Sequence, residues 1–128
     1  MDGQYGNIFT RNIGLFTDAE QEVIRKSSIA IAGVGGIGGL AAERLIRLGV
    51  GKLKFTDPGD METSNLNRQF GSSMLNIGQN KAKVAFDQIK DINLQAQISY
   101  STTGIRDEKD ANLFVGESIN EIMRSNNN

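Results

Sequence analysis

The sequence predicts an α/β fold in which a parallel sheet lies between layers of helices and ends after about three strands. Three observations predict it. A β-branched segment runs directly into a glycine-rich turn that opens a helix, a second strand ends at an aspartate, and a third short strand follows another helix. With 128 residues, of which 38% are apolar and 23% charged, the chain suits one globular domain.

The first helix of the domain should begin at a capping box. Thr17 and Glu20 have the residue types and spacing of that motif, which predicts a short helix to about Lys26. Residues 28–32 are β-branched or small and show no polar alternation, which predicts a strand buried on both faces of the sheet. The next helix is expected over residues 37–48, because their apolar side chains fall on one face.

Two more strands and two more helices are expected downstream. Residues 52–56 alternate polar and apolar side chains and predict the second strand, and residues 96–101 predict the third. Residues 59–76 form a long polar loop, a length that in compact domains usually indicates function or disorder. Amphipathic helices are expected over residues 78–89 and 107–115.

The chain is therefore divided into three parts. Residues 1–16 are polar and punctuated by glycine, and we expect an irregular arm that packs on the domain. Residues 17–116 form the α/β domain, and residues 117–128 a polar tail. No apolar strand follows the third one, so the first strand should keep an open edge that a partner chain or the tail would cover.

Composition excludes several kinds of chemistry. The sequence contains no cysteine and no histidine, so disulfides, thiolate nucleophiles and the commonest general base and metal ligand are absent together. Fourteen basic residues against fifteen acidic ones give a net charge of −1, which does not suggest nucleic acid or a membrane surface as a partner. The first residues lack the pattern of a signal peptide, and we expect a cytoplasmic protein.

The glycine turn predicts a nucleotide site. Gly33, Gly35, Gly36 and Gly38 lie between a strand and a helix, an arrangement that lets the backbone approach phosphate groups. Asp57 ends the next strand about twenty residues later, where it could accept hydrogen bonds from ribose hydroxyls. This is a Rossmann-like arrangement, and on its own it also fits an NAD(P)-dependent oxidoreductase.

A polar, arginine-bearing loop after the second strand favours a triphosphate instead. It has the sequence SNLNRQF at residues 64–70, and IGQNKAKV follows at residues 77–84. With the turn IAGVGGIGG at residues 31–39 and Asp57, these segments resemble the amino-terminal half of the ThiF/MoeB/HesA family, the adenylyltransferases related to ubiquitin-activating enzymes. The resemblance extends from the arm to about Phe114.

The resemblance implies a function and a set of site residues. It implies ATP and Mg²⁺ as cofactors, and an activity that converts a carboxylate into an acyl adenylate. Arg68 and Lys81 would contact the ATP phosphates, and Asn65 and Gln69 would line the same pocket. Arg11 would cross a homodimer interface to reach the ATP of the partner. The acceptor would be the carboxyl terminus of a ubiquitin-like protein, a sulfur-carrier protein or a peptide.

The sequence departs from the family pattern in two ways. The family usually has Asp-x-Asp after the second strand, whereas Pro58 and Gly59 separate Asp57 from Asp60 here. The aspartate that holds magnesium in the family lies in a later strand that this sequence does not contain, so no metal ligand is assigned. An alternative interpretation is therefore a non-catalytic module that binds a nucleotide or forms dimers.

Overall fold

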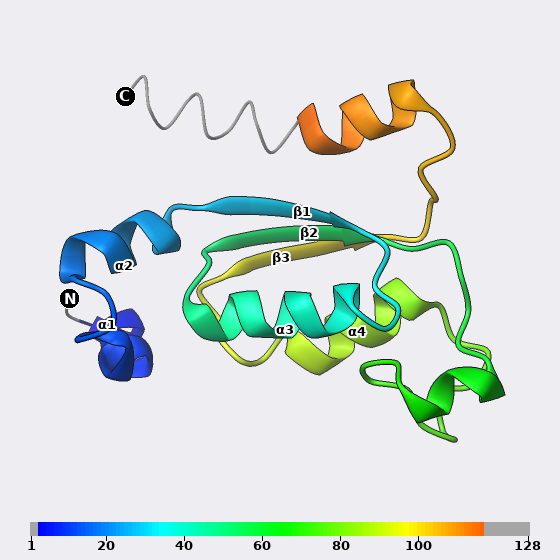
Figure 1. Ribbon diagram of the computed structural model, residues 1–128, viewed down its shortest axis with the longest axis horizontal. Coiled ribbons are helices and arrows are strands. Elements are labelled where there is room, and N and C mark those ends of the chain that lie inside the picture. Colours follow the sequence, from blue (N-terminus) through cyan, green and yellow to red (C-terminus); the bar gives the residue numbers. More distant parts are fainter. Residues whose placement is uncertain (1–2, 117–128) are drawn as a thin grey trace.

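A computed structural model describes residues 3–116 of the chain (Figure 1). The elements follow one another as α1 (Gly3–Phe9), η1 (Thr10–Asn12), α2 (Asp18–Arg25), β1 (Ser28–Ala32), α3 (Gly38–Leu48), β2 (Lys52–Thr56), η2 (Thr63–Asn67), α4 (Lys81–Ile89) and β3 (Gln97–Ser101). Residues 108–116 form a further helix. The tail expected at residues 117–128 lies outside the described residues.

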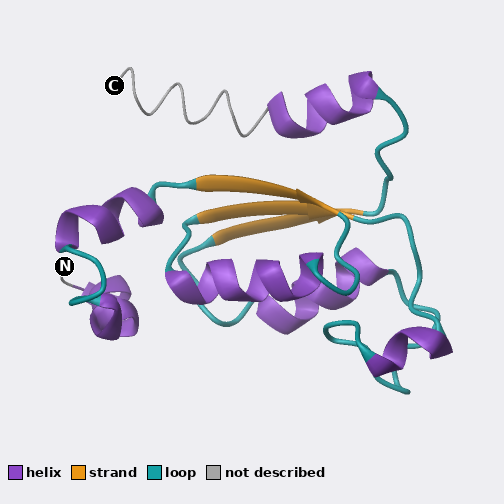
Figure 2. Ribbon diagram, in the orientation of Figure 1, coloured by secondary structure: helices purple, strands orange, loops and turns teal. Residues whose placement is uncertain are grey.

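The three strands form one parallel sheet in the order β1-β2-β3, as predicted. In its register Ile31 pairs with Phe55, and Phe55 with Tyr100. Helices α3 and α4 lie against one face of the sheet, and the 108–116 helix lies on the other (Figures 1 and 2). The three-layer α/β fold is therefore confirmed for this part of the chain.

The core lies between the sheet and the two helices α3 and α4. Because side chains alternate along a strand, Leu53 and Phe55 of β2 point to this face and are fully buried. They pack with Ile46 of α3 and with Ile89 of α4 in one apolar cluster. This cluster fixes the two helices, whose amino-terminal ends flank the carboxyl edge of the sheet.

Strand β1 is less buried than its sequence predicts. We expected burial on both faces, but its residues are only partly buried and Ala32 is exposed. The reason is its position, because β1 is an end strand of the sheet and no strand of residues 3–116 pairs with its outer edge. A β-branched sequence is compatible with either environment, so the composition of β1 did not distinguish them.

The arm is more regular than its sequence predicts. We expected irregular structure, but Gly3–Phe9 form helix α1. The rings of Tyr5 and Phe9 are buried and lie 4.5 Å apart, and the Tyr5 hydroxyl donates to the Gly49 carbonyl at 2.7 Å. These tertiary contacts stabilise a helix that its glycines disfavour.

The other helices begin and end close to their predicted limits. The Thr17 hydroxyl accepts from the Glu20 backbone N–H, and the Glu20 carboxylate accepts from the Thr17 N–H, so the predicted capping box is present. Helix α4 begins at Lys81 rather than near residue 78, because the Asn80 side chain caps it by accepting from the Lys83 N–H. Within residues 3–116, no helix is long and apolar enough to cross a bilayer.

Candidate nucleotide-binding site

The glycine turn connects β1 to α3 and requires glycine at two of its positions. Gly33 has a φ of +90°, which side-chain-bearing residues rarely adopt, and its N–H donates to the Thr56 carbonyl of β2 at 2.8 Å. At Gly38 an added Cβ would lie 1.8 Å from the Gly33 carbonyl oxygen. Gly36, in contrast, has open space on the side where a Cβ would stand. The turn is therefore tightly folded and leaves one side free at Gly36.

Asp57 ties this turn to the end of β2. Its Oδ2 accepts from the backbone N–H of Val34 at 3.0 Å, and its Oδ1 accepts from that of Gly59 at 2.8 Å. Each carboxylate oxygen has capacity for a further hydrogen bond. Asp57 thus has a structural role in addition to the ribose contact that the sequence predicts.

The polar loop after β2 packs on the turn through Gln69. An ideal Cβ on Gly35 would lie 3.5 Å from Gln69 Oε1, and one on Gly39 would lie 3.0 Å from Phe70 Cβ. The Gln69 Oε1 atom is buried and finds no hydrogen-bond donor within residues 3–116. The structure therefore brings Gln69 together with the turn, and a contact of Gln69 with ATP stays a prediction.

Asn65 organises the loop from its interior. It is only 5% exposed, and its Oδ1 accepts from the Glu62 N–H at 2.8 Å at the start of η2. Its carbonyl oxygen accepts from the N–H groups of Arg68 and Gln69 at 3.1 and 2.9 Å. Asn65 thereby fixes the two residues that follow η2.

Arg68 is exposed at the end of η2. Its guanidinium donates to the Ser64 carbonyl at 3.2 Å and to Asn67 Oδ1 at 3.0 Å, so the side chain lies along its own loop. In the described part of the chain it forms no ion pair. Arg68 immediately precedes Gln69, the residue that contacts the turn.

Lys81 lies at the first position of α4, close to the end of β2. The Cδ and Cε atoms of its side chain would lie 3.6 and 3.7 Å from a Cβ added to Gly59. Its backbone N–H donates to the Gly59 carbonyl at 2.9 Å. The Asn80 side chain donates to the carbonyls of Asp57 and Gly59 at 2.8 and 3.2 Å, which holds this helix start in place. Lys81 forms no ion pair with another described residue.

Arg11 is not brought to this site within one chain. It is exposed on η1, and the arm docks at the carboxyl end of α3, where Asn12 donates to the Leu48 carbonyl at 3.1 Å. The glycine turn opens the other end of α3, which is about 16 Å long by its residue count. Figure 1 shows the arm and the turn at opposite ends of this helix.

A cavity of about 370 Å³ lies at the carboxyl ends of β1 and β2, beside the turn. One wall contains Ala32, Gly33, Thr56 and Pro58, and the other contains Gly104, Ile105 and Arg106. Our sequence analysis missed the second wall. The carboxyl ends of parallel strands meet at one edge of the sheet, and this rule could have pointed to the residues after the third strand.

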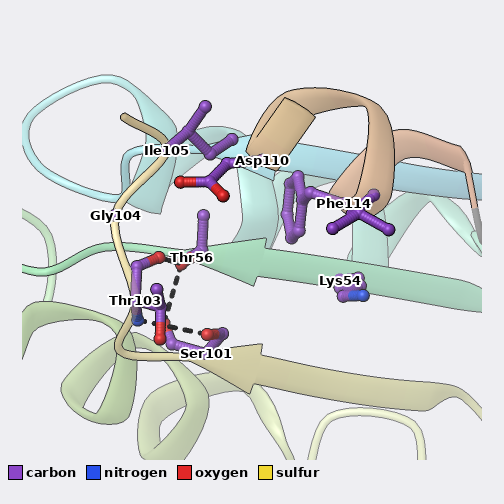
Figure 3. A pocket seen from close by; sticks show the side chains of 9 residues that line it. Lys54, Thr56, Ser101, Thr103, Gly104, Ile105, Asp110 and Phe114 are labelled. Carbon is purple, nitrogen blue, oxygen red and sulfur yellow. Dashed lines mark hydrogen bonds between the residues drawn. The ribbon is translucent and has the colours of Figure 1, made fainter. Parts of the chain in front are cut away.

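A second cavity, of about 210 Å³, adjoins the first and shares Thr56, Gly104 and Ile105 with it. Figure 3 shows it between the sheet and the 108–116 helix, which contributes Asp110 and Phe114. The Lys54 ammonium lies 5.1 Å from the centre of the Phe114 ring. This cavity is on the face of the sheet opposite α3 and α4.

Metal-ligating side chains do not cluster in the described part of the chain. No group of three or more acidic, cysteine or histidine side chains converges within residues 3–116. Asp57 uses both carboxylate oxygens for backbone N–H groups, and Asp60 is exposed and pairs through its backbone with Asn80. Since Mg²⁺ in nucleotide sites is held by one or two carboxylates together with the phosphates, the described residues assign no particular side chain to this ion.

The fold and the site together define a class of protein. A parallel α/β sheet, a glycine turn at a helix amino terminus and an aspartate at the end of the second strand are the features of a nucleotide-binding domain. Within that class the chain belongs to the ThiF family, whose model matches residues 9–123.

Individual relatives agree with this assignment. The chain is 36% identical over 90 residues to the tRNA threonylcarbamoyladenosine dehydratase of Bacillus subtilis, an alignment that covers 70% of this chain and 35% of that protein. It is 34% identical over 115 residues to ubiquitin-like modifier-activating enzyme 5 of Caenorhabditis briggsae, covering 90% of this chain and 26% of that enzyme.

Solved structures show the same fold. The structure superposes on 47% of the Escherichia coli tRNA N6-threonylcarbamoyladenosine dehydratase in complex with AMP, using 91% of this chain, with a TM-score of 0.84 and 24% identity. It also superposes on 36% of E. coli MccB with ATP, using 88% of this chain, with a TM-score of 0.76 and 26% identity. The chain therefore spans less than half of these proteins.

Proposed function

We propose that this chain is the nucleotide-binding part of an ATP-dependent adenylyltransferase that activates a carboxylate as an acyl adenylate. One observation carries the proposal. The loop that bears Arg68 packs through Gln69 against the glycine turn, and Asp57 ties the same turn to the second strand. The arginine-bearing loop, which favours a triphosphate, therefore lies against the turn expected to approach the phosphates. The matches to MccB with ATP and to the dehydratase with AMP support the choice of nucleotide.

We expect each part of ATP to bind a different part of this site. The base enters the cavity between Pro58 and Ile105, where apolar surface favours a planar ring. The ribose hydroxyls donate to Asp57, and the phosphates lie over the open side of Gly36, close to the first amides of α3. Lys81 provides a point charge beside the end of β2, and Arg68 swings from its own loop to provide a second one.

The proposed reaction requires positioning rather than a general base. A carboxylate oxygen of the acceptor attacks the α-phosphorus of ATP, an acyl phosphate bond forms, and the bond to pyrophosphate breaks. The nucleophile is already an anion, so no proton has to be removed. The protein's part is to hold the phosphates in line and to stabilise the charge that moves to the leaving pyrophosphate.

The acceptor and the assembly are part of the same proposal. We expect the carboxyl terminus of a ubiquitin-like protein, a sulfur-carrier protein or a peptide as acceptor, in the cytoplasm. We also expect a homodimer in which Arg11 reaches the ATP of the partner subunit. Its exposed position far from the turn of its own chain supports a role across an interface.

Calorimetry with ATP, AMP and NAD tests the nucleotide, and exchange of labelled pyrophosphate into ATP tests the reaction. We expect ATP to bind more tightly than NAD, and exchange to require an acceptor. Tighter binding of NAD would reject the proposal in favour of redox chemistry. For Arg11, the variant Arg11→Ala should weaken ATP binding in a preparation shown by light scattering to be dimeric, and unchanged affinity there would reject the role across the interface.

A non-catalytic module is the second candidate function. The observation that favours it is the lack of a converging carboxylate set within residues 3–116. This candidate predicts that ATP binds without pyrophosphate exchange for any acceptor, whereas the adenylyltransferase predicts both.

A further inference from the structure

We propose that Arg106 lies over the nucleobase in the cavity beside the glycine turn, and that Asp110 is the residue that positions it. This inference rests on the proposed function, because it assumes that the base of ATP enters that cavity. It adds a base-contacting residue from the wall that follows the third strand.

The position of Arg106 is the first argument. Residues 104–106 form one wall of the cavity, and Gly33 and Pro58 belong to the opposite wall. The two walls approach closely at their base, since a Cβ on Gly104 would lie 2.9 Å from Pro58 Cγ. Arg106 therefore stands at the rim of a narrow space whose floor is apolar.

The way in which Asp110 holds Arg106 is the second argument. One carboxylate oxygen, Oδ2 of Asp110, accepts from the Arg106 Nε at 3.1 Å and from the Arg106 backbone N–H at 3.3 Å. Asp110 itself is fixed, because its N–H donates to Asp107 Oδ1 at 2.8 Å in the first turn of the 108–116 helix. Backbone and side chain of Arg106 are thus tied to the same atom.

The energetics favour a role in orientation. The Arg106 side chain is 79% exposed, and an exposed ion pair of this kind contributes little to stability. What the pair does is restrict the rotamers of a long side chain, which reduces the entropy lost when the guanidinium contacts a ligand. The remaining guanidinium N–H groups and the planar face stay available to a purine ring, which guanidinium groups stack on well.

The test measures binding of three probes to the whole chain and to the variant Arg106→Ala. The probes are ATP, AMP and inorganic tripolyphosphate, which lacks a base. We expect the Kd of ATP and of AMP to rise by the same factor, about two-fold to five-fold. The affinity for tripolyphosphate should not change. The matched control is Arg47→Ala, which removes the arginine of another exposed pair four residues apart, Arg47 with Glu43, and should leave all three affinities unchanged.

The positioning role of Asp110 has its own readout. Asp110→Asn should weaken ATP binding by a smaller factor, and it should have no further effect when Arg106 is already alanine, because Asp110 acts through the arginine. A merely structural aspartate would weaken binding in both backgrounds. Circular dichroism of each variant verifies that it is folded.

Three outcomes would overturn the inference. Unchanged ATP and AMP affinities in Arg106→Ala, with ATP bound by the unmodified chain, would reject Arg106 alone and leave the proposed function intact. Weaker binding of tripolyphosphate in that variant would show a phosphate contact instead of a base contact. Failure of the unmodified chain to bind ATP would reject the proposed function and this inference together.

Discussion

The carboxylate of Asp57 accepts a hydrogen bond from the backbone N–H of Val34 at 3.0 Å, across 23 residues of sequence. One side chain at the end of β2 therefore fixes the shape of the turn that follows β1. Since Val34 is fully buried, its N–H has no access to water as an alternative partner. The acid that the sequence assigns to ribose also determines the geometry of the glycine turn.

Asp57→Ala should lower both stability and nucleotide affinity. Removing the acceptor leaves the Val34 N–H unpaired, which costs about 1–3 kcal/mol of unfolding free energy. Urea denaturation measures this loss, and calorimetry with ATP measures the affinity. Asp91→Ala, at an exposed position, is the control and should change neither. An unchanged unfolding free energy in Asp57→Ala would contradict the structural role of the carboxylate.

Two alanine substitutions in the turn should separate folding from binding. Gly36→Ala adds a methyl group to open space, so the melting temperature should hardly change while ATP affinity falls, because the methyl group meets the phosphates. Gly38→Ala places a Cβ against the Gly33 carbonyl and should destabilise the fold itself. Thermal melts with and without ATP distinguish the two effects. Normal ATP affinity in Gly36→Ala would place the phosphates elsewhere.

Lys81→Ala should weaken ATP binding without lowering stability. Lys81 forms no ion pair with another described residue, so its charge is available to phosphates at little structural cost. The control is Lys83→Ala two positions further on α4, where the ammonium is exposed and pairs with Asp87 at 2.8 Å. Calorimetry should show a higher Kd for the first variant alone. Equal losses of ATP affinity in the two variants would indicate a long-range electrostatic effect rather than a direct contact of Lys81 with ATP.

Gln21→Leu should detach the arm from the domain. Gln21 is fully buried, donates to the Tyr5 hydroxyl and to the Leu48 carbonyl, each at 3.0 Å, and accepts from Asn12. Leucine has a similar volume but leaves these groups unpaired, which should lower the unfolding free energy by about 1–3 kcal/mol. Gln88→Leu, at an exposed position on α4 away from the arm, is the control. Faster hydrogen exchange at residues 3–12 should accompany the loss of stability.

The Asp110 pair should have a defined pH dependence. The hydrogen bonds from the Arg106 side chain and backbone lower the pKa of Asp110 below its usual range. Because the folded state lowers this pKa, any stability from the pair is present above the pKa of the unfolded chain and is lost as the pH falls through that of the folded chain. Carbon NMR of the carboxyl group should show a higher midpoint in Arg106→Ala. Asp87, whose pKa is lowered by Lys83, should titrate as before in that variant.

Local signals in the sequence predicted most of the fold. The capping box at Thr17 and the alternation along β2 depend on neighbouring residues alone, and both are present in the structure. Helix α1 was not predicted, because its stability depends on contacts of Tyr5 with Gly49, 44 residues away. The exposure of β1 was not predicted either, since a strand's sequence does not show what lies beyond its edge.

The candidate site was predictable to a similar extent. Spacing pointed to Asp57 and the glycine turn, and the structure joins them by a hydrogen bond. The approach of Gln69 to Gly35 depends on how the loop after β2 folds back onto the turn. The spacing of apolar residues in the sequence does not predict the path of such a loop. The edge rule for parallel strands points to the segment after the third strand, but the wall with Arg106 itself forms by packing of Gly104 against Pro58, residues far apart in the sequence. The roles of the glycine turn, Asp57 and Gln69 toward ATP stay predictions, as do those of Arg11, Asn65, Arg68 and Lys81.

The groups that join the arm to α3 have a consequence for solution conditions. Tyr5, Asn12 and Gln21 are all neutral near pH 7, and burial raises the pKa of the Tyr5 phenol above its ordinary value. Ionic strength screens charges but has little effect on such contacts. The amino-terminal segment should therefore keep its place in concentrated salt, under conditions that would weaken a segment attached by ion pairs.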